Sequence, residues 1–310
     1  MSEPLLPVSV VIDGESLDRY SRGRHCYKLT CYMAAALVSA VMYLAVKDAS
    51  MDSPVERGLT AAGSFVTCFA VFIWFASKWE AWPITFMFCL RGATIAVFLS
   101  VIFESWAQSS LNPSDKFLFL PTMMLAVGFS EEAGKLAAVL FATSFAITDL
   151  NPQRSCLTLV RNPRLLAFLG ICVGFGFMMT ENIEYFAMVD LDNSNGDEDQ
   201  LRVERILTAL IRTFLNLHPL LTGLVSARLA RRLSKPGRTD FSTHIGDWLA
   251  ALWVPALIHG GFDFAVSLLP TVIDDPLLGN LLSLVTVAGT WLFTLRLLRA
   301  QYANLPEQFS

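Results

Sequence analysis

The sequence predicts an all-α integral membrane protein, a polytopic helical bundle of about eight transmembrane helices. Of the 310 residues, 54% are hydrophobic and only 16% are charged, whereas about a quarter of a typical soluble domain is charged. The mean hydropathy is +0.51. Several apolar runs also reach the roughly 20 residues that an α-helix needs to cross the hydrocarbon layer. These observations argue against a soluble globular protein and place the chain in a lipid bilayer.

Charged and polar breaks divide the chain into eight apolar runs, each a candidate span. The fourth run is too long for one straight crossing at about 1.5 Å of rise per residue. We therefore expect this run to tilt, to break, or to end in the membrane interface. The eight expected spans are residues 29–46, 58–77, 83–103, 117–147, 164–189, 206–228, 248–268 and 279–298.

The distribution of basic residues predicts the orientation of these spans. With a cytosolic N-terminus, fifteen Lys and Arg residues fall in cytosolic segments, five fall outside, and Arg91, Lys135 and Arg212 lie within spans. This asymmetry fits the positive-inside rule. We expect a cytosolic N-terminal segment (1–28), one transmembrane domain (29–298) and a cytosolic tail (299–310). In a prokaryotic cell the membrane would be the plasma membrane.

Charge and cysteine content exclude two further classes of protein. The net charge of −4 is spread over loops, so no basic patch suggests a nucleic-acid partner. Four of the six cysteines, Cys31, Cys68, Cys89 and Cys172, lie inside apolar runs, where they are expected to pack as small hydrophobic side chains. No disulfide framework or CxxC metal motif is present. The sequence does not predict an oligomeric state.

Ionisable residues inside the spans are the most informative feature, because each costs a few kcal/mol near the centre of a bilayer. Four consecutive spans contain them, within the segments GFSEEAGKLAAVLF, GFGFMMTENIEYF, LNLHPLLTG and ALIHGGFDF. Arg91 and Arg212 are expected to be structural, pairing with carboxylates or snorkelling. The candidate catalytic residues are Glu131, Glu132, Glu181, His218, His259 and Asp263, with Lys135 and Asn182 in supporting roles.

Spacing predicts which of these groups meet within one helix. Lys135 lies four residues after Glu131 and three after Glu132, so either carboxylate can reach the ammonium. We expect at least one of the two glutamates to stay unpaired. His259 and Asp263 are also four residues apart and share a helix face. Adjacent carboxylates in a low-dielectric pocket do not both ionise readily. A carboxylate that exchanges its proton near neutral pH can act as a general base on water.

The two histidines extend this chemistry in one of two ways. His218 or His259 could donate a hydrogen bond to the oxyanion that forms when water attacks an amide. Alternatively, a glutamate from the pair with Glu181, His218 and His259 would form a carboxylate–imidazole set suited to zinc, with Asp263 orienting His259. The candidate metal ligands are Glu181, His218 and His259. HExxH is absent, which excludes the familiar helical zinc-protease site. The residues alone leave metal dependence open.

The succession of motifs resembles the PrsW family of intramembrane proteases, part of a superfamily that includes the type II CAAX prenyl proteases. The family pattern is EExxK, FxxxE, a histidine and HxxxD on successive membrane helices. It matches EEAGK at 131–135, FMMTE at 177–181, His218 and HGGFD at 259–263. The likeness covers roughly residues 117–268. Each motif is short, but four in order, each in its own span, are specific.

The resemblance implies hydrolysis of peptide bonds of membrane-embedded or membrane-anchored proteins. Carried over by position from the prenyl proteases, it makes Glu131 the base, Glu181 its partner, and His259 with Asp263 the groups that polarise the carbonyl. Relative to those enzymes, Glu181 replaces a histidine and Asp263 an asparagine. The more anionic pocket favours a bound metal, or a proton shared between acids.

Two other functions remain open from sequence. Glu, His and Asp at mid-membrane also build proton or cation paths in transporters, although no internal repeat is evident. A catalytically inactive relative could instead bind transmembrane helices as a scaffold. Small residues beside the motifs, such as Gly174 and Gly260, would let a substrate helix approach closely in either a protease or a scaffold.

Overall fold

The computed structural model describes ten stretches of the chain and is helical almost throughout. The described residues are 65–73, 82–111, 124–141, 143–145, 158–160, 162–188, 211–212, 214–235, 245–273 and 276–306. The expected first span, 29–46, and the expected N-terminal segment, 1–28, lie outside them. Residues 65–73 of the expected second span are helical.

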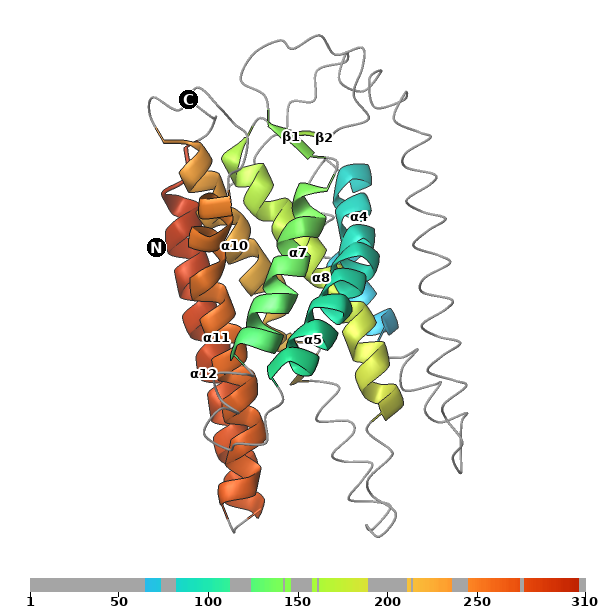
Figure 1. Cartoon of the computed structure of the whole chain (residues 1–310), viewed down its shortest axis with the longest axis vertical. Coiled ribbons are helices and arrows are strands. Elements are labelled where there is room, and N and C mark those ends of the chain that lie inside the picture. The colour runs from blue at the N-terminus through green and yellow to red at the C-terminus, as the bar shows by residue number, and fades with distance from the viewer. Residues whose placement is uncertain are drawn as a thin grey trace.

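Seven α-helices, two π-helical segments and two short strands are labelled within the described part of the chain. The helices run along the long axis of the molecule (Figure 1). The elements are α4 (Trp82–Arg91), η1 (Gly92–Ala96), α5 (Val97–Leu111), η2 (Met124–Phe129), α7 (Ser130–Leu140), β1 (Thr143–Phe145), β2 (Thr158–Val160), α8 (Pro163–Met188), α10 (His218–Leu233), α11 (Ile245–Val272) and α12 (Pro276–Ala303).

Four stretches of these helices are long and apolar enough to cross a membrane. They are Ile84–Trp106, Pro163–Tyr185, Ile245–Val266 and Leu281–Ala303. They correspond to the expected spans 83–103, 164–189, 248–268 and 279–298, and the last helix continues past 298 to Ala303. The all-helical membrane architecture is therefore confirmed, while the described residues leave the count of eight spans a prediction.

Helix α8 forms the centre of the bundle. Asn162 caps its start by accepting hydrogen bonds from the backbone amides of Arg164 (2.8 Å) and Leu165 (3.3 Å), and Pro163 supplies a first helical residue that needs no hydrogen-bond partner for nitrogen. The helix packs most extensively on α10 and also contacts α4 and η1. Because 83% of its apolar window is buried, against 17% for α12, α8 is the central span and α12 a peripheral one.

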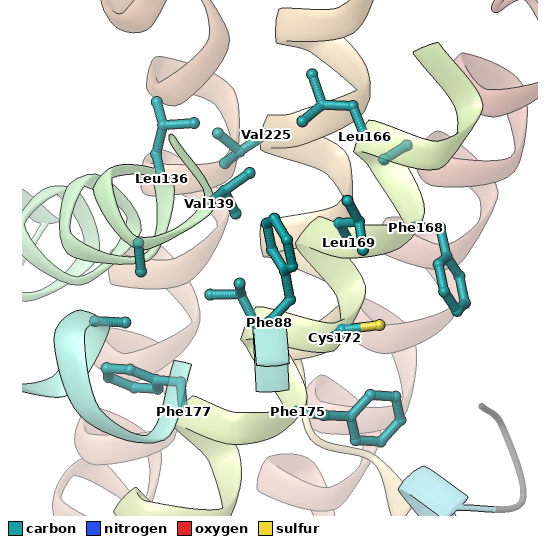
Figure 2. Close-up of a cluster of buried hydrophobic side chains, with 14 of the residues drawn as sticks. Phe88, Leu136, Val139, Leu166, Phe168, Leu169, Cys172, Phe175, Phe177 and Val225 are labelled. Carbon is teal, nitrogen blue, oxygen red and sulfur yellow. The ribbon is translucent and has the colours of Figure 1, made fainter. Parts of the chain in front are cut away.

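The hydrophobic core lies around α8 and is shown in Figure 2. Phe88 of α4, Phe168 of α8 and Leu136 of α7 are buried almost completely. Cys172 is also buried there, as are Cys68 and Cys89. These three thiols therefore pack as small hydrophobic side chains, as their positions in apolar runs predict; Cys31 lies outside the described residues.

The long fourth run is broken, as its length predicts. The π-helical segment η2 leads directly into α7, which ends at Leu140. Residues Thr143–Phe145 then form β1, which pairs in parallel with β2. π-Helical turns often occur at functional sites, and here η2 ends at Phe129, two residues before Glu131.

The sixth run differs from the expectation of one helix over 206–228 with His218 near its middle. Residues 211–212 are helical, but 215–217 are not, and α10 begins at His218. Asn216 causes the new start by accepting a hydrogen bond from the His218 backbone amide at 2.9 Å, and Pro219 follows in the first turn, where proline is favoured. His218 is therefore the first residue of a helix rather than a mid-span residue.

Two glycines let the site-bearing helices approach closely. A Cβ on Gly174 of α8 would overlap the carbonyl oxygen of His218, and a Cβ on Gly128 of η2 would overlap the backbone of Ala256 and Gly260 in α11. Because glycine has no side chain, α8 can lie against the start of α10, and η2 can lie against α11. These contacts bring the four motif-bearing segments together.

Candidate metal centre

The six predicted catalytic residues, from four separate elements, form one cluster, in which Glu131, Glu132, His218 and His259 are buried and Glu181 and Asp263 are partly exposed. Glu131 and Glu132 occupy the first turn of α7, and Glu181 lies in α8. His218 begins α10, and His259 lies in α11, one turn before Asp263. The imidazole rings of His218 and His259 meet edge to face, with 5.0 Å between their centroids.

Lys135 pairs with both glutamates of α7. Its Nζ lies 3.0 Å from Oε2 of Glu131 and 2.9 Å from Oε1 of Glu132, and also 4.1 Å from the centroid of the Phe177 ring. Lys135 and Glu132 are completely buried. The expectation that one glutamate stays unpaired is wrong, because one helical turn brings both carboxylates to the same ammonium. Oε2 of Glu132 is nevertheless buried without a hydrogen-bond partner among the described residues.

The two nitrogens of His218 have different partners. Nε2 lies 2.6 Å from Oε2 of Glu181, and Nδ1 lies 2.8 Å from Nζ of Lys135. An ammonium only donates, so Nδ1 must accept, and Nε2 therefore carries the proton that is donated to Glu181. This tautomer is assigned from the partners. The Nδ1 lone pair therefore faces Lys135, and Oε2 of Glu131 lies 3.8 Å from the same nitrogen. A metal ion bound there would take this lone pair from Lys135.

His259 is oriented in the same manner by the other glutamate of α7. Its Nδ1 donates to Oε1 of Glu132 at 3.0 Å, which turns Nε2 toward Oε2 of Glu131 at 3.6 Å. Asp263 flanks this nitrogen, with its Oδ2 3.5 Å from Nε2. The predicted meeting of His259 and Asp263 on one helix face is confirmed.

The donor atoms of Glu131, His218 and His259 lie close enough together to hold one ion. One ligand atom from each of these three buried residues lies within 4.8 Å of the others. Two imidazoles and one carboxylate are a donor set that zinc prefers. A carboxylate on the outward nitrogen of each imidazole is the arrangement that orients histidine ligands in metal sites. The residues present therefore fit a metal ion, with Glu131 rather than Glu181 completing the set.

A small cavity adjoins this cluster. It has a volume of about 70 Å³, enough for several water molecules. The side chains of Glu181 and Asp263, about a quarter exposed, connect it with the buried histidines. The cavity is lined by Glu181, Ile211, Arg212, Leu215, Asn216, Leu217, His218, His259, Phe262, Asp263 and Val287.

Asn182, expected to support the site, contacts the cluster indirectly, through a neighbouring arginine. Its Oδ1 accepts a hydrogen bond from Nε of Arg212 at 3.0 Å, and its Nδ2 lies 3.4 Å from Sγ of Cys68. Arg212 also binds Oε2 of Glu181 at 2.9 Å. Arg212 thus pairs with a carboxylate, as expected, and that carboxylate belongs to the site.

One further acidic residue near the cluster was not among the sequence candidates. Glu104 of α5 interacts electrostatically with Glu131, Lys135 and His259. The expected third span, 83–103, stops just before Glu104, but the helix continues to Leu111. An acidic residue inside such a helix is the signal that could have identified it.

A carboxylate–imidazole cluster inside a bundle of membrane-length helices, beside a small cavity, is the arrangement expected of an intramembrane metallohydrolase. Residues 80–292, more than half of the chain, match the PrsW family of intramembrane metalloproteases. The chain belongs to this family, so the resemblance seen in the sequence is confirmed. No match was found among curated proteins or among solved structures.

Proposed function

We propose that this chain is a zinc-dependent protease in which Glu131, His218 and His259 hold the metal. The convergence of their donor atoms within 4.8 Å is the observation that carries this proposal. A bound zinc ion would supply Lewis acidity, which polarises a peptide carbonyl and acidifies bound water. Glu181, a candidate ligand by sequence, takes the role of orienting His218 through Nε2.

Glu132 is the residue we assign as general base. Its Oε1 is held by Lys135 and by Nδ1 of His259. Its buried Oε2 has no partner among the described residues, so this oxygen is available to accept a proton from water. Glu132 does not itself line the adjoining cavity, so we expect water to reach it past His259, which lines the cavity and binds Glu132. The assignment selects Glu132 from the Glu131–Glu132 pair.

Lys135 and Asp263 support the reaction from two sides. The ammonium of Lys135 offsets the charge of two buried carboxylates, which would otherwise be costly in a low-dielectric interior. Asp263 lines the cavity beside His259, where it can accept a hydrogen bond from the substrate amide or the leaving amine. Its partial exposure agrees with contact to an incoming chain.

The substrates we propose are membrane-spanning or membrane-anchored proteins in the lipid bilayer. Family membership establishes a protease, and a protease within a bilayer meets its substrates there. Because an α-helix shields its own peptide bonds by hydrogen bonding, a substrate helix must unwind locally to present a carbonyl to the cluster. Short unwound segments at polar or glycine-containing positions are the expected cleavage sites.

The test compares new protein termini in membranes from cells expressing the wild type or the Glu131→Gln, Glu132→Gln double variant. We expect termini that appear only with the wild type and that map within or beside transmembrane segments. Glu307→Gln, in the expected tail, is the matched control and should give the wild-type pattern. Identical termini from folded, equally abundant wild type and double variant would refute protease activity and favour ion transport or scaffolding.

The topology of eight spans with both termini in the cytosol remains part of the proposal. The asymmetric distribution of Lys and Arg supports it, as do the four membrane-length helices. The domain limits 1–28, 29–298 and 299–310 follow from the same topology. An epitope inserted at 190–205 should be accessible in intact cells, and one after Ser310 only in permeabilised cells. The reverse pattern would invert the orientation.

A further inference from the structure

Arg212 makes a set of contacts that go beyond neutralising a buried charge. Its guanidinium lies against three side chains of α8. One nitrogen binds Oε2 of Glu181 at 2.9 Å, and Nε donates to Oδ1 of Asn182 at 3.0 Å. Its Cζ lies 4.1 Å from the centroid of the Tyr185 ring. A planar guanidinium that binds two acceptors and stacks on a ring has little remaining freedom.

These contacts restrain the carboxylate that orients His218. Oε2 of Glu181 is shared between Arg212, at 2.9 Å, and Nε2 of His218, at 2.6 Å. Asn182 is completely buried, so the second anchor of Arg212 is itself fixed. The sequence of contacts is therefore Asn182 to Arg212, Arg212 to Glu181, and Glu181 to His218. The Nδ1 of His218 lies 2.8 Å from Lys135 and 3.8 Å from Glu131.

We propose that Arg212 is a positioning residue that fixes the Glu181 carboxylate and, through it, holds Nδ1 of His218 toward the metal centre. This inference rests on the proposed metal site and adds to it an outer contact that sets the orientation of one ligand. Arg212 acts through Glu181, although it also lines the cavity. The geometry distinguishes it from Arg228, which binds the backbone carbonyls of Ala250 and Ala251 in α11.

The first experiment measures Zn²⁺ and Co²⁺ affinity of the purified full-length protein in bilayer discs, together with kcat and KM for a cleaved substrate. Residues that orient a ligand typically change affinity or activity by about 10- to 100-fold, so we expect Arg212→Gln to weaken metal binding about tenfold. Arg228→Gln is the matched control; it should lower stability without changing metal affinity.

A double-variant comparison then tests whether Arg212 acts through Glu181. If it does, Arg212→Gln should have little further effect on metal affinity in a Glu181→Gln background. Additive losses would overturn the proposal. Arg212→Lys keeps the charge and guards against a variant that fails to fold, but it loses the planar two-acceptor contact. We expect Arg212→Lys to recover only part of the metal affinity. Full recovery would show that Arg212 serves only to neutralise charge, and would overturn the positioning role.

A second readout separates failure of this inference from failure of the proposed metal site. The ¹⁵N NMR signals of the His218 ring, assigned by comparison with His218→Gln, report which nitrogen carries the proton without any metal. We expect an Nε2-protonated form in both proteins, because Lys135 still donates to Nδ1, but a shifted and broadened Nε2 signal in Arg212→Gln, where Glu181 is no longer fixed. An unchanged Nε2 signal in Arg212→Gln would overturn the positioning role. A wild type that binds no metal would refute the metal site alone.

Discussion

The carboxylate of Glu181 accepts a hydrogen bond from the imidazole of His218, with 2.6 Å between Oε2 and Nε2. This contact joins α8 to the first residue of α10 and fixes which His218 nitrogen faces the interior. Glu132 makes the corresponding contact with Nδ1 of His259. Each imidazole thus has its own carboxylate on the side away from Glu131. Such outer carboxylates orient histidine ligands and increase their basicity.

Glu181→Gln should weaken both metal binding and turnover while leaving the protein folded. The amide has lost the negative charge that holds the Nε2–H of His218, so the imidazole is less well oriented. Removing an outer carboxylate of this kind typically costs about 10- to 100-fold. Metal affinity and kcat, measured on the same preparation, check the prediction. Wild-type values for both would show that Glu181 does not orient His218.

Glu131→Gln and Glu132→Gln should have different effects, although the two residues are adjacent. Glu131→Gln removes a proposed ligand and should release the metal. Glu132→Gln should weaken metal binding about 10- to 100-fold, as Glu181→Gln should, because Glu132 orients His259. At saturating zinc it should still hold the metal but lose about 10²- to 10⁴-fold in kcat, the usual contribution of a general base. Metal content and single-turnover kinetics distinguish the variants. Metal loss in Glu132→Gln with retention in Glu131→Gln would exchange the two roles.

Lys135→Met should destabilise the fold strongly. The side chain is completely buried and binds both Glu131 and Glu132, so its removal leaves buried carboxylates without their cation, at a cost of about 3–5 kcal/mol. The free energy of unfolding in detergent micelles measures this loss. Adding Glu132→Gln should recover part of it, because one unpaired charge is then removed. The exposed Arg231 serves as control, since Arg231→Met should change stability little.

Gly174→Ala should impair activity by moving His218. The added Cβ would overlap the His218 carbonyl oxygen and the Cα of Pro219, so α8 and the start of α10 must separate. Overpacking of this kind costs about 1–3 kcal/mol. Gly289→Ala in α12 is a matched control, because a Cβ there meets nothing within 4 Å. Equal activity of both variants would show that the close approach at Gly174 is not needed.

Contacts within one helix could be predicted from spacing, whereas contacts between helices could not. The three- and four-residue intervals predict that either glutamate can reach Lys135 and that His259 meets Asp263, but not that both glutamates bind Lys135 at once. Nothing in those intervals pairs Glu181 with His218 or Glu132 with His259, since these contacts depend on how separate helices pack. The donor chemistry of the in-span residues and the family motifs indicated that the four segments share a site, but neither indicated which side chains pair.

The hydropathy pattern does not predict the break in the helix before His218. Leu215 and Leu217 keep the run 206–228 apolar, so a hydropathy criterion continues the helix through them. The local signal is Asn216 followed by His218 and Pro219, because an asparagine side chain can bind the amide two residues on and proline favours a first turn. Local cap chemistry therefore decided where this helix begins, and with it the position of a proposed ligand.

The most direct test of the account is X-ray absorption spectroscopy of the zinc-loaded wild type, with His218→Ala and His259→Ala for comparison. We predict one bound zinc with two imidazole nitrogens and carboxylate oxygen at about 2.0–2.2 Å. One imidazole contribution should disappear in each histidine variant that retains metal. A wild type that binds no zinc, or one whose zinc ligands are unaffected by both substitutions, would contradict the central claim that these histidines and Glu131 form a metal centre.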